Sequence, residues 1–65
     1  MRLDAYKMRV QLAIHKMKRP DIVKTGVSLG TVNNAFNENR ISEATARKIA
    51  NAIGVDLSEI LKKEA

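Results

Sequence analysis

Cysteine and tryptophan are absent from this chain, and histidine, tyrosine and phenylalanine each occur once. Without cysteine the protein can form neither a disulfide nor a thiolate metal site, and the lone His15 cannot hold a metal by itself. The lack of a disulfide framework fits a reducing compartment, so we expect a cytoplasmic protein. No apolar run reaches the roughly 18 residues that a membrane span needs, so no membrane contact is expected.

The β-branched and aromatic clusters that favour strands are missing as well. Alanine, isoleucine, leucine and lysine are plentiful, and this composition predicts an all-α protein. With 65 residues the chain makes one small domain, near the lower limit at which a core is stable without disulfides or metals. No nucleophile–base pair, glycine-rich phosphate loop or metal-ligand set has a recognisable spacing, so we expect neither an enzyme nor a bound cofactor.

Positive charge is concentrated in the first third of the chain. Residues 1–24 contain seven Lys and Arg against two Asp, which leaves +5, whereas residues 25–65 contain five charges of each sign. A basic segment of this kind favours attraction to a polyanion. The alternative is that these side chains only keep a small protein in solution.

Residues 26–37 have the pattern of a sharp turn followed by a short helix. Gly26 can adopt the positive φ that ends one helix, and the Ser28 hydroxyl can accept an N–H of the next helix near Thr31. Spacing at i, i+3 and i+4 then makes one buried stripe, formed by Val32, Ala35 and Phe36.

The opposite side of this helix carries small or amide-bearing residues. These are Gly30, Asn33, Asn34 and Asn37. Amides that donate and accept together suit the edges of bases, adenine above all, so this side is a candidate surface for reading DNA. The alternative is a short solvated helix with asparagine at its frayed end.

Periodicity predicts a first helix from about Asp4 to Lys16. Its expected core face consists of Leu3, Tyr6, Val10, Ala13, Ile14 and Met17. On that phasing Met8 and Leu12 point to the far side. They are either incidental surface residues or a small contact patch for a protein partner.

Three further helices complete the expected fold. A short one begins at Pro20, buries Ile22 and Val23, and ends before Gly26. Another is capped by Ser42 and ends at Gly54. The core face of this helix is expected to be Ala46, Ile49, Ala50 and Ile53, and a last short helix is expected to begin at Asp56.

Five short helices with a glycine turn between the second and third are typical of a compact DNA-binding domain. The motif Gly-Val-Ser-x-x-Thr-Val at 26–32 resembles the Cro/C1-type helix-turn-helix family of phage and bacterial repressors, also called the XRE family. The run Thr-Ala-Arg-Lys-Ile-Ala-Asn-Ala-Ile-Gly-Val-Asp-Leu-Ser-Glu-Ile-Leu at 45–61 resembles the two closing helices of that family. The resemblance implies one lambda-repressor-like domain over 1–65, and a Cro-like repressor whose third helix reads an operator in the major groove.

Three features depart from the family pattern. The spacing from Val23 to Gly26 is one residue shorter than usual. Leu29 and Gly30 stand where the family often has Gln or Arg, so neither side chain there can hydrogen-bond a base edge. The loop after the third helix reads Phe-Asn-Glu, ending at Glu38, in place of the usual Glu-Asn-Gly.

The resemblance also implies roles for individual residues. Ser28 and Thr31 would bind phosphate, while Asn33 and Asn34 are candidates for base edges. Leu29 would touch a thymine methyl group or pack on the second helix, and Gly30 would allow close approach to the DNA backbone.

Other residues would contribute charge or backbone contacts around that helix. Arg40, with Asn37, lies in the loop that the family uses for phosphate contacts, although a plain surface position is the alternative. Sequence-independent attraction would come from Lys18, Arg19 and Lys24.

Family members usually dimerise on palindromic operators, so a homodimer on double-stranded DNA is expected. The dimer would form through Leu57, Ile60 and Leu61, unless these residues close the core of the monomer. An alternative function is a modulator or antirepressor that binds a partner repressor and itself binds DNA weakly, as Leu29 and Gly30 and the far-side Met8 and Leu12 indicate. An antitoxin subunit is a third alternative, although the chain lacks the toxin-binding tail usual in such proteins.

Overall fold

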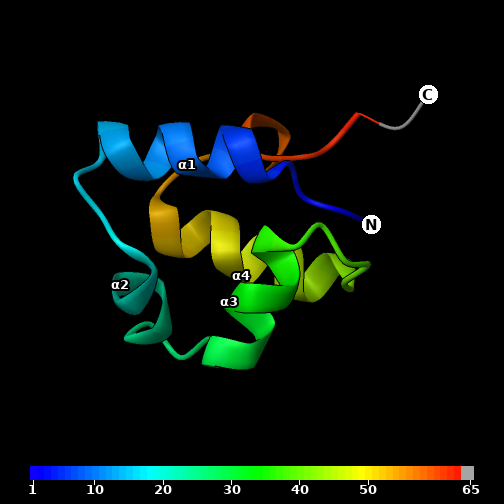
Figure 1. The fold of residues 1–65 in the computed structure, drawn as a ribbon, viewed down its shortest axis with the longest axis horizontal. Coiled ribbons are helices and arrows are strands. Elements are labelled where there is room, and N and C mark those ends of the chain that lie inside the picture. The colour runs from blue at the N-terminus through cyan, green and yellow to red at the C-terminus, as the bar shows by residue number, and fades with distance from the viewer. Residues whose placement is uncertain (64–65) are drawn as a thin grey trace.

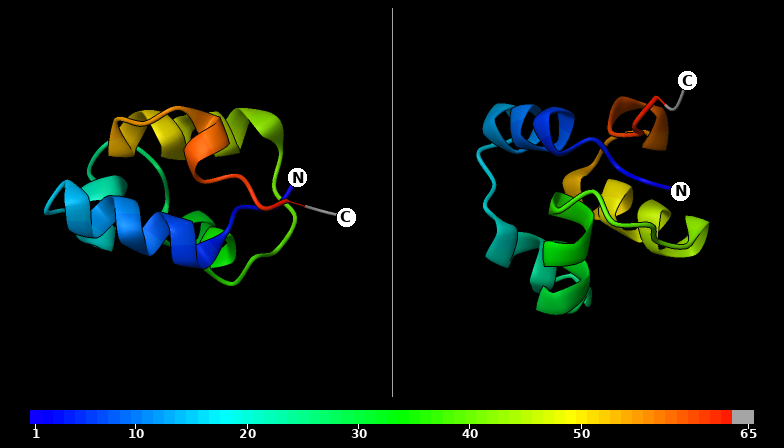
Figure 2. Two further views of the ribbon diagram at one scale, coloured as in Figure 1. Left: turned by 90° about the horizontal axis from the view of Figure 1, so that it is seen from above. Right: turned by 45° about the vertical axis from the view of Figure 1, so that its right-hand side comes forward.

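The computed structural model describes residues 1–63, and within them the chain is all-helical, with four α-helices, a 3-10 turn and no strand. The elements are α1 (Ala5–Ile14), α2 (Arg19–Val23), α3 (Leu29–Phe36), α4 (Glu43–Ile53) and η1 (Leu57–Glu59). Figure 1 shows α1 along one side of the molecule and α2 and α3 on the opposite side, and the view from above in Figure 2 shows α4 to one side of all three. The all-α class and the first four helices are thus confirmed, whereas the fifth is a single 3-10 turn.

Short polar side chains begin three of the four α-helices, as expected for Ser28 and Ser42. The Ser28 hydroxyl accepts a hydrogen bond from the Thr31 N–H at 3.2 Å, and Ser42 is arranged in the same way at the start of α4. Asp4 caps α1 by accepting the Lys7 N–H at 3.1 Å. Because the first N–H groups of a helix have no partner within it, each cap satisfies a donor that would otherwise need water.

Three helices end in a residue with left-handed backbone, but only one of these residues is glycine. The φ angles are 54° at Lys16 after α1, 59° at Glu38 after α3 and 89° at Gly54 after α4. In each case the next N–H bonds back to a carbonyl five residues earlier, as from Met17 to Leu12 at 2.8 Å. This is the Schellman arrangement, for which glycine is the usual residue.

The buried face of α1 is the opposite of the predicted one. Met8 and Leu12, expected as a partner patch on the far side, are 0% and 7% exposed and belong to the core. Tyr6 and Ile14, expected in the core, are 73% and 64% exposed, and Val10 is 37% exposed. A partner surface formed by Met8 and Leu12 is therefore ruled out.

The prediction is wrong because it takes the helical phase from residues outside the helix. Leu3 precedes α1 and Met17 follows it, and both do pack on the core. Since α1 is apolar on two sides, its own periodicity does not choose between them. The left-handed turn at Lys16 redirects the chain, so that the position of Met17 no longer reports the inner face of the helix.

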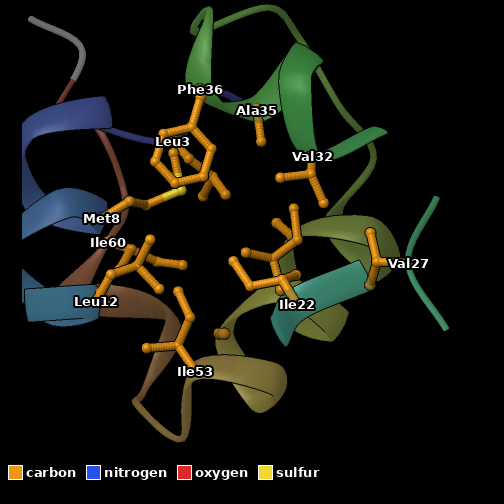
Figure 3. Packing of buried hydrophobic residues seen from close by; sticks show 13 residues of the cluster. Leu3, Met8, Leu12, Ile22, Val27, Val32, Ala35, Phe36, Ile53 and Ile60 are labelled. Carbon is orange, nitrogen blue, oxygen red and sulfur yellow. The ribbon is translucent and has the colours of Figure 1, made fainter. Parts of the chain in front are cut away.

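The core draws on all four helices and on the segments that flank them. Figure 3 shows Met8 of α1 and Phe36 of α3 pointing toward one another. Ile60 is fully buried beside them, and Leu57 and Leu61 are half-buried against the same cluster. Ile60 therefore closes the monomer core, and its expected place at a dimer interface is wrong.

The residues before α1 pair with two segments that are distant in sequence. The Ile41 N–H donates to the Met1 carbonyl at 2.8 Å, and the Met1 ammonium donates to the Ile41 carbonyl at 3.0 Å. Leu3 forms an isolated antiparallel bridge with Leu61. The N-terminus and the segment after η1 consequently lie side by side (Figure 2).

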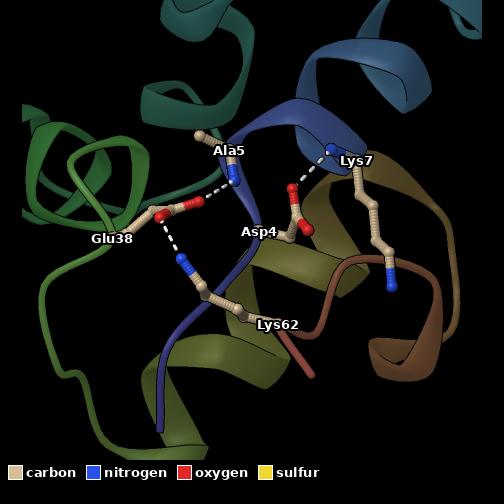
Figure 4. Close-up of polar contacts among 5 residues, drawn as sticks. All are labelled: Asp4, Ala5, Lys7, Glu38 and Lys62. Carbon is tan, nitrogen blue, oxygen red and sulfur yellow. Dashed lines mark hydrogen bonds and ion pairs between the residues drawn. The ribbon is translucent and has the colours of Figure 1, made fainter. Parts of the chain in front are cut away.

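Glu38 joins these segments to the start of α1 (Figure 4). Its carboxylate accepts the Ala5 N–H at 3.0 Å and also accepts a hydrogen bond from the Lys62 ammonium. The bond from Lys62, followed by that from Ala5, holds the pKa of Glu38 below its ordinary value of 4.5. Glu38 thus caps a helix that is distant from it in the chain.

The revised phase of α1 can be tested by two truncations on the same helix. We expect Met8→Ala to lower the free energy of unfolding by about 2–5 kcal/mol, because it leaves a cavity in the core. Val10→Ala on the outer face should change it by less than about 0.5 kcal/mol. Urea denaturation of both variants provides the measurement, and a larger loss for Val10→Ala would restore the phase expected from the sequence.

The linkage of Glu38 to folding predicts a specific pH dependence. Its pKa is lower in the folded state, so its stabilising effect is present above the unfolded value and is lost as the pH falls through the folded one. Glu38→Gln should therefore destabilise the protein at pH 7, and the difference from wild type should shrink below the ordinary value of 4.5. Glu43→Gln, which removes an exposed pair with Arg47, is the control and should have a smaller effect. If the stability difference between wild type and Glu38→Gln stayed constant down to acid pH, this assignment would be contradicted.

Candidate nucleic-acid interface

The link between α2 and α3 is a short turn built around Gly26. Its φ of 107° lies in the region that L side chains rarely adopt, so glycine is needed for the change of direction. Val27 then turns inward and is 7% exposed, which anchors the turn on the core. Ser28 follows as the cap of α3. The turn therefore fixes where α3 starts and which of its sides faces water.

The outward side of α3 carries the residues that the sequence placed there. Val32, Ala35 and Phe36 are buried on the other side. Leu29 is 56% exposed, so it does not pack away against α2. The exposed residues of α3 and its two caps are Ser28, Leu29, Gly30, Asn33, Asn34 and Asn37.

Gly30 has no structural reason to be glycine. Its φ is not in the left-handed region, and a Cβ added there would meet no atom within 4 Å. A glycine inside a helix costs about 1 kcal/mol relative to alanine. The fold thus loses stability at this position, and what it gains is bare backbone in the first turn of an exposed, uncharged face.

Arg19 extends across α3 and is not a free surface cation. Its guanidinium carbon lies 4.2 Å from the centroid of the Phe36 ring, and its Nη1 donates to the Asn33 Oδ1 at 3.4 Å. The first contact is of the cation–π type. A positive charge is therefore held beside the amide face of α3, a placement that the sequence did not indicate.

The amides and hydroxyls along α3 are partly engaged with one another. Asn34 accepts from the Asn39 amide at 3.3 Å, so the loop after α3 steadies its side chain. Ser28 and Thr31 share a hydroxyl–hydroxyl bond of 2.7 Å. One hydroxyl proton of that pair and the Asn34 amide protons remain for an outside acceptor such as a phosphate or a base edge.

Thr31, predicted to contact phosphate with Ser28, lies on another side of α3 than the asparagines. It is half-buried and lines a shallow hollow between the turn and α4, together with Thr45 and Lys48. Thr31 thus faces α4, and the structure does not bring it together with Asn33.

Several cations surround α2 and α3. Besides Arg19, four exposed cationic side chains in this region make no ion pair within residues 1–63, which leaves their charge available to an anionic partner. They are Lys18, Lys24, Arg40 and Lys48.

Sequence reasoning missed Lys48. It lies on α4 and borders two hollows beside the turn at Gly26. Nothing in the local sequence marks it, because its closeness to the turn arises from packing between elements distant in the chain. Arg47, one residue earlier, is instead paired with Glu43 at 3.1 Å.

No family model, curated protein or solved structure matches this chain. Among residues 1–63, no helix combines the length and apolar character needed to cross a membrane. The same residues contain no group of three His, Asp or Glu side chains arranged to hold a metal ion.

Substitution of two glycines by alanine should have opposite effects on stability. Gly30→Ala should raise the free energy of unfolding by roughly 0.5–1 kcal/mol, because alanine is the better helix former and the space is open. Gly26→Ala should lower it, because alanine is strained at φ 107°. Denaturant titration of both variants provides the measurement, and destabilisation by Gly30→Ala would show that glycine is required there by the fold.

Proposed function

We propose that this chain is a sequence-specific, Cro-like DNA-binding regulator. In this proposal α2, the turn at Gly26 and α3 form a helix-turn-helix, and the exposed side of α3 enters the major groove of double-stranded DNA. Such a helix is the usual reading element of helix-turn-helix proteins. Because one small domain reads few base pairs, we propose binding as a homodimer to a palindromic operator.

Gly30 is the observation that supports this proposal most directly. It sits in open space on the exposed side of α3, next to side chains that can hydrogen-bond base edges. A helix that lies close against DNA benefits from missing side-chain bulk at the point of approach, which accounts for a residue that the fold itself disfavours. Asn34, one turn further along, is the preferred candidate for a base contact.

Charge around α3 supports the same proposal. Arg19 lies beside Asn33 on this surface, and Lys18, Lys24 and Arg40 flank it without ion-pair partners within residues 1–63. A nearly neutral reading face between cations separates two tasks. The cations attract phosphate irrespective of sequence, whereas the amides distinguish bases.

The alternative proposal, a modulator that binds a partner repressor, retains only one of its two supports. Met8 and Leu12 are in the core and cannot form its surface. Leu29 and Gly30 at the start of α3 remain, because they give no hydrogen bond to a base edge.

The proposal is tested by selecting duplexes from a random library with the whole chain. We expect a repeated half-site and binding that weakens steeply with salt. On the selected duplex, Asn34→Ala should reduce discrimination against a scrambled duplex by about 1–3 kcal/mol. Gly30→Ala should weaken binding while leaving the protein folded.

Two control variants distinguish recognition of bases from sequence-independent attraction to phosphate. Lys24→Ala should weaken binding to both duplexes alike and reduce the salt slope by about 0.9 for each phosphate that is no longer neutralised. Gln11→Ala, which removes an amide from α1, should leave binding unchanged. Failure to enrich any half-site, or binding that is insensitive to salt, would refute the proposal.

A further inference from the structure

The exposed apolar side chains of this protein gather on one face of α1. Four large apolar residues are exposed within residues 1–63, and three of them, Tyr6, Val10 and Ile14, are spaced four apart on that helix. Residues at i, i+4 and i+8 lie above one another on a helix, so they form a continuous stripe. We call these three residues the α1 stripe. It lies on the outer side of α1, opposite the Met8 and Leu12 side chains that enter the core.

The α1 stripe has a shape and chemistry suited to docking a helix. A shallow groove runs beside it toward η1, with Lys7, Gln11, Ser58 and Glu59 along its length. Apolar anchors at helical spacing are typical of docked helices, and aromatic residues are enriched in the cores of protein interfaces. Since α1 packs on Phe36 and the rest of the core through its inner side, the stripe lies on the side opposite that contact.

The charges beside the α1 stripe indicate which charge a partner bound there should carry. Helix α1 contains no acidic residue, and it carries Lys7 on one flank of the stripe and Arg9 on the other. Lys7 donates to the Leu61 carbonyl at 3.3 Å, which leaves its charge unneutralised. Of the residues that line the groove, Glu59 alone is acidic, and it lies on the η1 side.

Pairing with a second copy of the chain is disfavoured by these charges. In a twofold antiparallel pair of α1 helices, the flank bearing Arg9 would meet the same flank of the other copy. In a parallel pair, Arg9 would meet the flank bearing Lys7. Both arrangements bring like charges together, which opposes association.

We propose that the α1 stripe is a docking site for an amphipathic helix of another protein whose apolar row is flanked by Asp or Glu. The apolar row would pack on Tyr6, Val10 and Ile14, and its carboxylates would pair with Lys7 and Arg9. The occupant leaves α3 uncovered, so docking and DNA binding do not compete for one surface. This site stands independently of the proposed function, because it uses no residue of the candidate nucleic-acid interface.

The test uses a designed helical peptide of about 18 residues with a leucine row flanked by glutamate, and a second peptide with lysine in place of each glutamate. Fluorescence anisotropy with the full chain should show at least about tenfold tighter binding of the glutamate peptide. Amide shifts in an NMR titration should map to α1 and to residues 58–61.

Matched variants locate the site. The double variant Tyr6→Ser and Ile14→Ser should lose about tenfold in affinity, whereas Leu29→Ser, which removes an exposed apolar residue from α3, should lose none. Arg9→Glu should shift the preference toward the lysine peptide, whereas Lys24→Glu should not.

Four results would overturn the proposal. Equal binding of the two peptides would contradict the proposed pairing of Lys7 and Arg9 with carboxylates of the partner. Shifts that map to α3, or binding abolished by Lys24→Glu, would make the peptide a DNA mimic. Binding to vesicles rich in anionic lipid, with the same dependence on Ile14 and without peptide binding, would make the stripe a membrane contact. A dimer in sedimentation equilibrium that Ile14→Ser abolishes would assign the stripe to a second copy of the chain.

Discussion

The contact between Glu38 and the start of α1 is the constraint on which the arrangement of the helices depends. It links the end of α3, the first N–H of α1 and the ammonium of Lys62 in a single carboxylate. A chain this short buries few side chains, so a polar tie between distant segments weighs more than it would in a larger domain. With α1 held at the end of α3, its inner residues meet Phe36 and its outer residues are left in water.

Local chemistry made much of the fold predictable. Ser28 and Ser42 cap helices because a hydroxyl after an extended residue accepts a free N–H, and this depends only on near neighbours. Gly26 and Gly54 end helices for an equally local reason. Lys16 and Glu38 adopt the same left-handed backbone although they are not glycine, and the local sequence does not indicate this conformation. The left-handed backbone at helix ends was therefore predictable where glycine supplies it and not elsewhere.

The face of α1 could not be predicted because it is decided by packing and not by periodicity. A helix with apolar residues on two sides has two possible inner faces, and the choice rests on what lies across from it. In the candidate interface, too, local spacing predicted some features and tertiary packing decided the others. The exposed side of α3 followed from its own spacing, whereas the position of Arg19 against Asn33 and Phe36 and that of Lys48 beside the turn required the tertiary fold.

The pairing of the chain ends has a consequence for proteolysis. Lys62 provides the ammonium that binds Glu38, and its N–H donates to the Arg2 carbonyl at 3.1 Å. Cleavage after Leu61 would remove both bonds, although neither Lys62 nor Lys63 is fully buried. The first turn of α1 would then lose the partner of its capping carboxylate, so a cut at one terminus would loosen the segment at the other.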